Sequence, residues 1–192
     1  MTVFVNGTNL TLDEIYRVSY LFEKVEITSE SLEKVQKCRN YVEKIIRENR
    51  VVYGITTGFG KFSTIKIPPE QTEELQENLI LSHATGVGPY FSVPETRAII
   101  LLRINVLAKG YSGIRPETLQ TLVEFLNKKI HPLIPEKGSV GASGDLAPLS
   151  HLALVLLGKG KAEYNGEILS GSAALERAKI SPVKLKAKEG LA

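Results

Sequence analysis

The stretch GASGD, residues 141–145, places a serine between two of the smallest residues, with an acid directly after them. It nearly matches the Gly-x-Ser-x-Gly elbow of serine hydrolases. However, Asp145 stands where that motif needs its last glycine, and no clear strand precedes the stretch. Ser143 or Asp145 can instead cap a helix that begins at Leu146. A cap needs only one such residue, so it does not account for the alanine and glycine on either side of the serine.

Backbone cyclisation is a chemistry that uses all three small residues. If a tight turn presses the Gly144 nitrogen against the Ala142 carbonyl carbon, loss of water closes an imidazolone ring. Loss of the Ser143 hydroxyl as a second water leaves an exocyclic methylidene. Glycine suits the attacking nitrogen because its backbone is permissive, and Asp145 can assist proton transfer. The product is an electrophile made from the chain itself, at a helix N-terminus that favours developing negative charge.

A second candidate is the glycine-rich stretch YGITTGFGKF, residues 53–62. It follows Val51-Val52, which places Tyr53 at the end of an expected extended segment. A phosphate-binding loop is excluded, because the glycine spacing is one residue too long and Phe62 replaces the required Ser or Thr. Tyr53 is either an ordinary core aromatic or a general base. A base would need a pKa well below about 10, which requires nearby positive charge or donors to the phenolate. The loop glycines favour a site.

The third candidate is His83 in NLILSHATGVG, residues 78–88, at the C-terminal end of an apolar helix. A lone histidine there is more often structural, or a partner of the helix dipole, than a ligand. His131 and His151 have no partners at metal-ligand spacing, so no metal site is expected. The single cysteine, Cys38, excludes an intrachain disulfide.

The elements that would position these residues are expected to be mainly α-helical. Apolar residues recur at three- and four-residue steps along much of the chain, which is the period of an amphipathic helix. Capping boxes are expected at Thr11 with Glu14 and at Ser92 with Glu95, and Ser29 is expected to cap another helix. The fold class is therefore mainly α, with short strands.

Prolines and glycines predict the remaining boundaries. The helix that Ser92 caps is apolar nearly all round, so it is expected to be buried. Asn165-Gly166 predicts a tight turn in a small hairpin near residues 162–169. The other expected boundaries are a helix opened by Pro68-Pro69, an end of the Ser92-capped helix at Gly110, a helix opened by Pro116, a helix from near Asp145 to Gly158, and Cys38 on a core-facing helix surface.

Composition is that of an ordinary soluble protein and excludes several classes. The 192 residues carry a formal net charge of +3 without a dense basic block, so nucleic-acid binding has no support. The longest apolar runs are too short to span a bilayer, and the N-terminus lacks the pattern of a signal peptide. The cysteine usage fits a reducing compartment, and a cytoplasmic location is expected.

The three stretches together resemble the aromatic amino acid ammonia-lyases that carry a methylidene-imidazolone group. GSVGASGDLAPLSH, residues 138–151, is similar to that family's cyclising signature, and YGITTGFG, residues 53–60, to its tyrosine loop. Order and spacing agree, and the similarity extends over essentially the whole chain. Ser82-His83, TGFGKF and RINVLAKGYSGIRPE most resemble the members that act on histidine.

The resemblance implies a role for each candidate. Ala142, Ser143 and Gly144 would form the electrophile, 4-methylidene-imidazol-5-one, with Asp145 assisting, and no external cofactor or metal is required. Tyr53 would remove the β-proton of L-histidine, and His83 with Ser82 would contact the imidazole. The products would be trans-urocanate and ammonia. Family members are mostly helical homotetramers, so a homotetramer is implied for a full-length protein.

The resemblance also shows departures. Thr56 stands where many histidine-specific members have asparagine, which bears on the substrate but not on the reaction class. The family's pattern continues beyond this chain into Leu-x-Asn-Gly-Thr and further site residues. We therefore expect residues 1–192 to be the N-terminal catalytic region of a longer enzyme, inactive alone. The alternatives are a lyase or aminomutase for tyrosine or phenylalanine, and a non-catalytic helical subunit that pairs with a separate C-terminal half.

Overall fold

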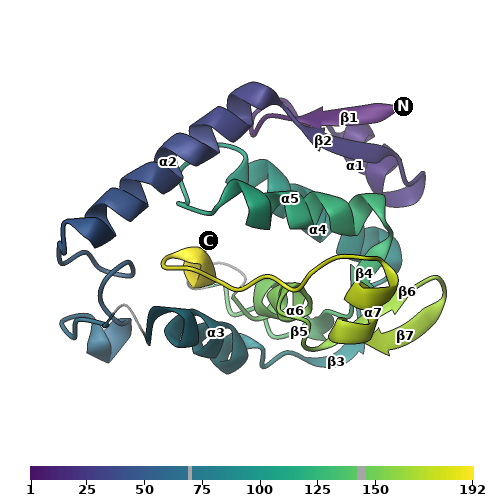
Figure 1. Cartoon of the computed structure of the whole chain (residues 1–192). Coiled ribbons are helices and arrows are strands. Elements are labelled where there is room, and N and C mark those ends of the chain that lie inside the picture. Colours follow the sequence, from purple (N-terminus) through teal and green to yellow (C-terminus); the bar gives the residue numbers. More distant parts are fainter. Residues whose placement is uncertain (69–70, 142–145) are drawn as a thin grey trace.

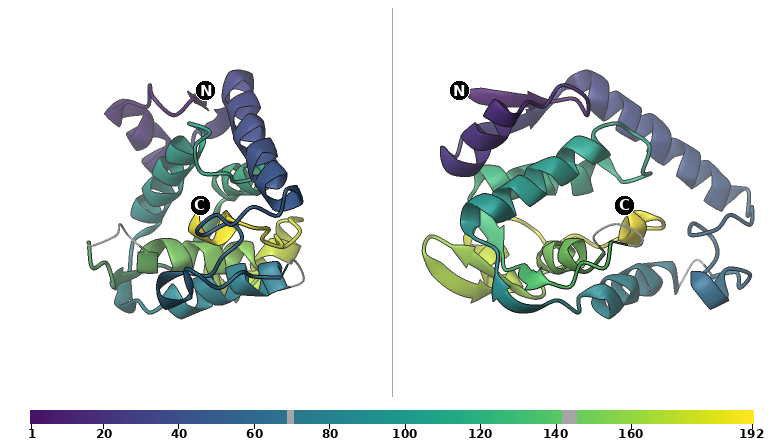
Figure 2. Two further views of the ribbon diagram at one scale, coloured as in Figure 1. Left: turned by 90° about the vertical axis from the view of Figure 1, so that its left-hand side faces the viewer. Right: turned by 180° about the vertical axis from the view of Figure 1, so that it is seen from behind.

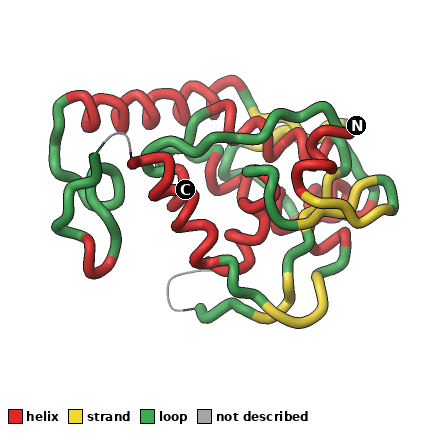
Figure 3. The backbone as a smooth tube through the Cα atoms, turned by 60° about the horizontal axis from the view of Figure 1, so that its bottom comes forward, coloured by secondary structure: helices red, strands yellow, loops and turns green. Residues whose placement is uncertain are grey.

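Helices are the main regular elements of the structure, and the strands are short (Figure 3). A computed structural model describes residues 1–68, 71–141 and 146–192. The α-helices among these residues are α1 (Leu12–Tyr20), α2 (Ser29–Arg47), α3 (Thr72–His83), α4 (Val93–Leu107), α5 (Pro116–Asn127), α6 (Leu146–Leu156) and α7 (Gly171–Arg177), with 3-10 turns at Gly60–Phe62 and Glu189–Leu191. The expected mainly helical fold is confirmed.

Three small sheets join these helices. The strands are β1 (Thr2–Val5), β2 (Lys24–Ile27), β3 (Val87–Tyr90), β4 (Ile130–Pro132), β5 (Pro135–Lys137), β6 (Lys161–Tyr164) and β7 (Glu167–Ser170). Strands β1 and β2 pair in parallel, β3 pairs antiparallel with β5, and β4, β6 and β7 form an antiparallel sheet in that order. The β6–β7 hairpin confirms the predicted turn, with Asn165 at φ 53° and Gly166 at φ 83°.

The packed pair α4 and α5 lies at the centre of the molecule (Figure 1). The segment from β1 to α2 lies on one side of this pair, and α3 and α6, which pack together, lie on the other (Figures 1 and 2). The C-terminal residues run back between α4 and α3, where the Gly190 amide donates to the Gln76 side-chain oxygen at 2.7 Å. The apolar core includes Ile100, Leu101, Ile104, Leu119, Phe125 and Leu126, all fully or almost fully buried.

Most of the predicted helix signals are confirmed. Both capping boxes are present, at Thr11 and at Ser92, and Pro116 opens α5. The prediction for α2 was wrong by one residue, because the extended residue that precedes the helix is Thr28, whose hydroxyl accepts from the Ser31 amide. Ser29 is the first helical residue.

Three further expectations need correction. Helix α3 begins only at Thr72, because Pro68 accepts the Gln71 amide in a turn before it; Pro69 lies outside the described residues. Cys38 is only half-buried and is not among the residues that form the core cluster or pack against it. Residues 51–52 form no strand, so Tyr53 follows an irregular segment.

Helix α4 is not buried on all sides, contrary to expectation. One face packs into the core, whereas Leu102 and Val106 are 46% and 53% exposed. These two residues line a cavity that is described below. Within the described residues, no helix is long and apolar enough to cross a membrane.

Arg97 on the buried face of α4 ties several elements together. Its Nε donates to the Val18 carbonyl at 2.9 Å and its Nη1 to the Leu126 carbonyl at 3.0 Å. The Nη1 also lies 3.3 Å from Nε2 of His131, whose Nδ1 is bonded to the Glu163 carboxylate. These contacts join α1, α5, β4 and β6 around one guanidinium.

Candidate active site

The predicted electrophile, Ala142-Ser143-Gly144, and Asp145 lie outside the described residues, but their flanks are described. Before them, Gly138 (φ +156°) is packed so closely that a Cβ there would lie 2.9 Å from the Gly86 Cα. Gly141 has φ +73°, and a Cβ at that position would meet nothing within 4 Å. After them, α6 begins at Leu146, which is 42% exposed. The described flanks are therefore a closely packed glycine followed by an open one on the N-terminal side, and the first residue of a helix on the C-terminal side.

The tyrosine loop is closed at its base by threonine hydroxyls. The Thr56 Oγ1 accepts from the Val52 amide at 2.9 Å and donates to the Arg50 carbonyl at 2.6 Å. The Thr57 Oγ1 accepts from the Gly54 amide at 3.3 Å. Both threonines are buried. Thr56, the departure from the usual asparagine, therefore has a structural role, since a short side chain with a hydrogen-bonding oxygen closes the loop.

Tyr53 itself projects from this loop. Its side chain is 60% exposed, and its ring meets the edge of Phe59 at 6.1 Å between centroids. Gly54 has φ +70°, and a Cβ there would lie 3.0 Å from the Leu191 Cδ1 and 3.2 Å from Phe59. A side chain at this position is therefore both strained and crowded. Tyr53 is not a core aromatic, and its phenol oxygen makes no hydrogen bond with the described residues.

His83 ends α3, with one nitrogen held by its own helix. The His83 Nδ1 lies 2.8 Å from the Leu79 carbonyl and 3.1 Å from the Ser82 Oγ. A carbonyl oxygen only accepts, so Nδ1 carries the proton. In the neutral ring, Nε2 is then an acceptor, and it makes no hydrogen bond with the described residues. The Ser82 hydroxyl donates to the same Leu79 carbonyl at 2.9 Å.

His151 and His131 are held differently. His151 on α6 accepts through Nε2 from the Gly86 amide at 3.0 Å, and burial lowers the pKa of the ring. Burial also lowers the pKa of His131, against the opposing effect of Glu163. No group of three or more metal-ligand side chains occurs among the described residues. The hydrogen bonds of His151 to Gly86 and of His131 to Glu163 connect parts of the fold.

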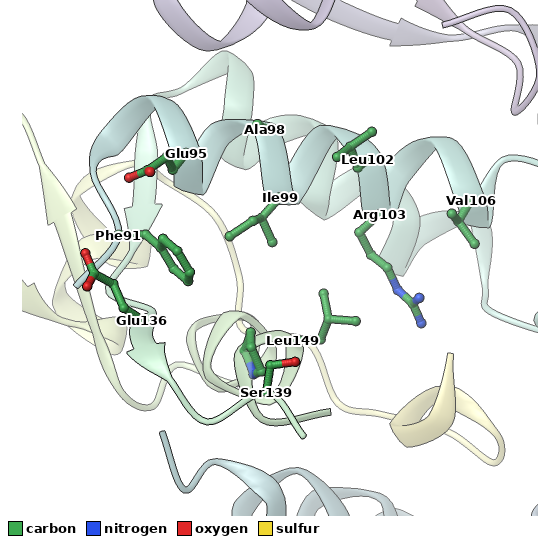
Figure 4. A pocket seen from close by; sticks show the side chains of 11 residues that line it. Phe91, Glu95, Ala98, Ile99, Leu102, Arg103, Val106, Glu136, Ser139 and Leu149 are labelled. Carbon is green, nitrogen blue, oxygen red and sulfur yellow. The ribbon is translucent and has the colours of Figure 1, made fainter. Parts of the chain in front are cut away.

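A cavity beside the electrophile segment was not predicted from the sequence. Its volume is about 550 Å³, and it lies between α4 and α6 (Figure 4). Ser139 and Pro148, which flank residues 142–145 on either side, both contribute to its wall. Figure 4 shows Ile99 and Arg103 extending from α4 toward the side where Leu149 of α6 stands. Neither Tyr53 nor His83 lines this cavity.

Arg103 is the charged residue that sequence reasoning missed. Burial lowers the pKa of its guanidinium, which makes no hydrogen bond or ion pair with the described residues. An arginine in an otherwise apolar helix face was the available signal, because such a charge is costly unless it meets a partner. The Gly86–His151 bond was also missed, since only the folded chain brings these residues together.

Comparison with known proteins assigns the family. A sequence profile of aromatic amino acid lyases matches residues 10–192. The chain belongs to the aromatic amino acid lyase family. The histidine ammonia-lyase of Alkaliphilus metalliredigens is 55% identical over 190 residues, which is 99% of this chain and 38% of that enzyme. The chain thus spans less than two fifths of the length of this curated relative.

Solved structures share the fold. The histidine ammonia-lyase of Trypanosoma cruzi matches with a TM-score of 0.92 and 41% identity, over all of this chain and 37% of that enzyme. The tyrosine aminomutase of Streptomyces globisporus matches with a TM-score of 0.91 and the same 41% identity, over all of this chain and 36% of that protein. The fold of this region is therefore common to enzymes of different specificity.

Proposed function

We propose that this chain is the electrophile-bearing region of an ammonia-lyase that converts L-histidine to trans-urocanate and ammonia. The observation that carries the proposal is the 55% identity to a histidine ammonia-lyase along nearly the whole chain. Identity to the solved aminomutase is 41%, the same as to the solved histidine ammonia-lyase. His83 supports the same substrate, because its Nε2 acceptor is unengaged by the described residues.

The flanks of residues 142–145 fit a protein-derived methylidene-imidazolone. The preceding Gly141 stands in open space and Val140 is exposed, so a substrate can approach from this side. The following α6 begins at Leu146, which places helix N-terminal amides beside the segment. The ring supplies an electrophilic carbon that takes up the substrate amine. Asp145 is proposed to assist its formation from Ala142, Ser143 and Gly144.

The remaining residues bind the substrate and move its proton. His83 is proposed to accept an N–H from the substrate imidazole at Nε2, with Nδ1 held by Leu79. The Ser82 Oγ, 3.1 Å from the same Nδ1, is proposed to help hold the orientation of the ring. Tyr53, exposed on its loop, is proposed to take the β-proton as the carbon–nitrogen bond breaks. Elimination then leaves the double bond of urocanate and ammonia.

Turnover is proposed to need more than residues 1–192. The described residues do not bring Tyr53, His83 and the large cavity into one pocket. The chain also covers only 38% of the length of a curated relative, which favours a longer enzyme. This enzyme is proposed to be cytoplasmic and to assemble as a homotetramer. No external cofactor, nucleic acid or membrane is part of the proposal. The isolated chain is expected to release urocanate at a negligible rate.

A lyase or aminomutase acting on tyrosine is the second candidate, because the solved aminomutase matches as well as the solved histidine enzyme. The test is ammonia release by the full-length protein from histidine, tyrosine and phenylalanine, with product identity checked by absorbance. Preference for histidine with urocanate as product supports the proposal. Preference for tyrosine, or formation of a β-amino acid, would contradict the proposal and support the second candidate.

A further inference from the structure

His151 joins two segments that the proposed function needs to keep in place. It lies on α6, which begins at Leu146, two residues after the proposed cyclising residues 142–144. Its Nε2 accepts from the amide of Gly86 at 3.0 Å. Gly86 lies three residues after His83, in the connection between α3 and β3. One hydrogen bond therefore connects the helix behind the electrophile to the chain that follows the imidazole-binding histidine.

The tautomer of His151 follows from this bond. An amide N–H only donates, so Nε2 must be unprotonated and the ring proton lies on Nδ1. Burial favours the same neutral ring by lowering its pKa. A protonated ring would turn an N–H toward the Gly86 N–H and break the contact. His151 is thus a fixed acceptor at neutral pH.

The two glycines near this hydrogen bond, Gly86 and Gly138, are closely packed. A Cβ on Gly86 would lie 3.0 Å from the His151 Nε2 and 3.1 Å from the Pro135 Cβ. A Cβ on Gly138 would lie 2.9 Å from the Gly86 Cα and 3.3 Å from the Cβ of Ala147. Ala147 and His151 are one helical turn apart, so one face of α6 contacts both glycines. This junction holds the start of α6, the β5 end and the residues after His83 together.

We infer that His151 is a positioning residue of the lyase, which sets His83 at a fixed place relative to the electrophile through the Gly86 amide. This inference rests on the proposed function. It assigns His151 no contact with substrate. Loss of the acceptor should loosen the residues after His83 and weaken histidine binding, while the electrophile still forms from its own three residues.

Two substitutions separate the hydrogen bond from the space that the ring fills. His151→Phe keeps a ring and removes the acceptor, whereas His151→Gln offers an amide oxygen that can accept from Gly86. In His151→Phe, we expect the Gly86 amide to exchange with solvent at least about tenfold faster. In the full-length protein, we expect KM for histidine to rise about tenfold with kcat nearly unchanged, because the half-buried Gly86 amide has lost its partner. His151→Gln should restore most of both effects.

The outcomes are distinct. Unchanged Gly86 exchange in His151→Phe would overturn the bond, and unchanged KM despite faster exchange would overturn the positioning role. If His151→Phe does not fold, Gly86→Ala supplies the second variant, and the inference predicts that it also raises KM with the mass of the electrophile intact. Failure of the unsubstituted full-length protein to turn over histidine would overturn the proposed function and the positioning role, but not the Gly86 bond, which exchange measures on its own.

Discussion

His131 and His83 are both hydrogen-bonded, but they differ in whether a ring nitrogen is left without a partner among the described residues. Both nitrogens of His131 are engaged, one by Glu163 and the other by Arg97, and the ring is buried. In His83 the same helix supplies the partner of Nδ1, and the described residues leave Nε2 without one. His131, with both nitrogens engaged, holds the fold together. His83 keeps an acceptor that can bind a ligand.

Two arginines on α4 also differ in their partners, although the buried Nη2 of Arg97 makes no hydrogen bond with the described residues. Arg97 is fully buried, with carbonyl partners from α1 and α5, and its guanidinium lies 4.4 Å from the centre of the Phe22 ring. Burial lowers the pKa of Arg97 to about 10, so it stays charged at neutral pH. Arg103 lines the cavity without a hydrogen bond to the described residues. One helix therefore has a structural face and a face that is open to a ligand or a neighbour.

The largest expected effect is at the buried Arg97. Arg97→Ala should lower the free energy of unfolding by about 4 kcal/mol, because it leaves a cavity and removes the donors of two buried carbonyls. The control is Arg177→Ala, whose ion pair with Glu167 is exposed and should contribute less than about 0.5 kcal/mol. Urea titration of each variant measures the difference. Similar midpoints for the two variants would contradict the structural role of Arg97.

A smaller effect, on catalysis rather than on stability, is expected at His83, whose Nε2 has no partner among the described residues. His83→Leu, combined with Ser82→Phe, should lower histidine turnover of the full-length protein about a hundredfold, since a site built for a hydrogen bond loses it. Activity on phenylalanine should rise relative to histidine. Stability should change by less than about 1 kcal/mol, because both side chains lie at a helix end with partial exposure. Unchanged histidine turnover would make His83 structural, like His131.

The third effect is a pH dependence of stability from His131. Because burial lowers its folded pKa, the unfolded chain takes up a proton first as pH falls through about 6.5. Stability from His131 is therefore present above that pH and is progressively lost below it, by about 1 kcal/mol between pH 7.5 and 5.5. Urea unfolding at the two pH values measures the loss. His131→Phe should show a smaller loss over the same interval, and an equal loss would assign it to other groups.

Local sequence signals predicted the elements well where one residue type decides the geometry. Thr11 and Ser92 cap helices because each has a glutamate three residues later, and Asn165-Gly166 turns because both residues accept positive φ. The predictions failed where neighbouring segments decide. Thr28 replaces Ser29 as the cap because β2 pairs with β1 up to Ile27 and leaves Thr28 extended.

The candidate site divides in the same way. Tyr53 and His83 were identified from local stretches, and the structure places Tyr53 exposed on its loop and His83 at a helix end. Their roles stay predictions. The Gly86–His151 contact and the cavity beside Arg103 join residues that lie far apart in the chain. No local sequence pattern could therefore predict them. Only packing brings such groups together.

The central claim, a protein-derived electrophile at residues 142–144, is tested most directly by the intact mass of the chain. Ring formation removes two waters, so the account predicts a mass about 36 Da below that of the encoded sequence, a covalent change that denaturation does not reverse. Ser143→Ala cannot form the methylidene and should not show this two-water loss. The measurement is made on the full-length protein, isolated and then cut back to this region. If the unsubstituted region has its full encoded mass, the account is contradicted.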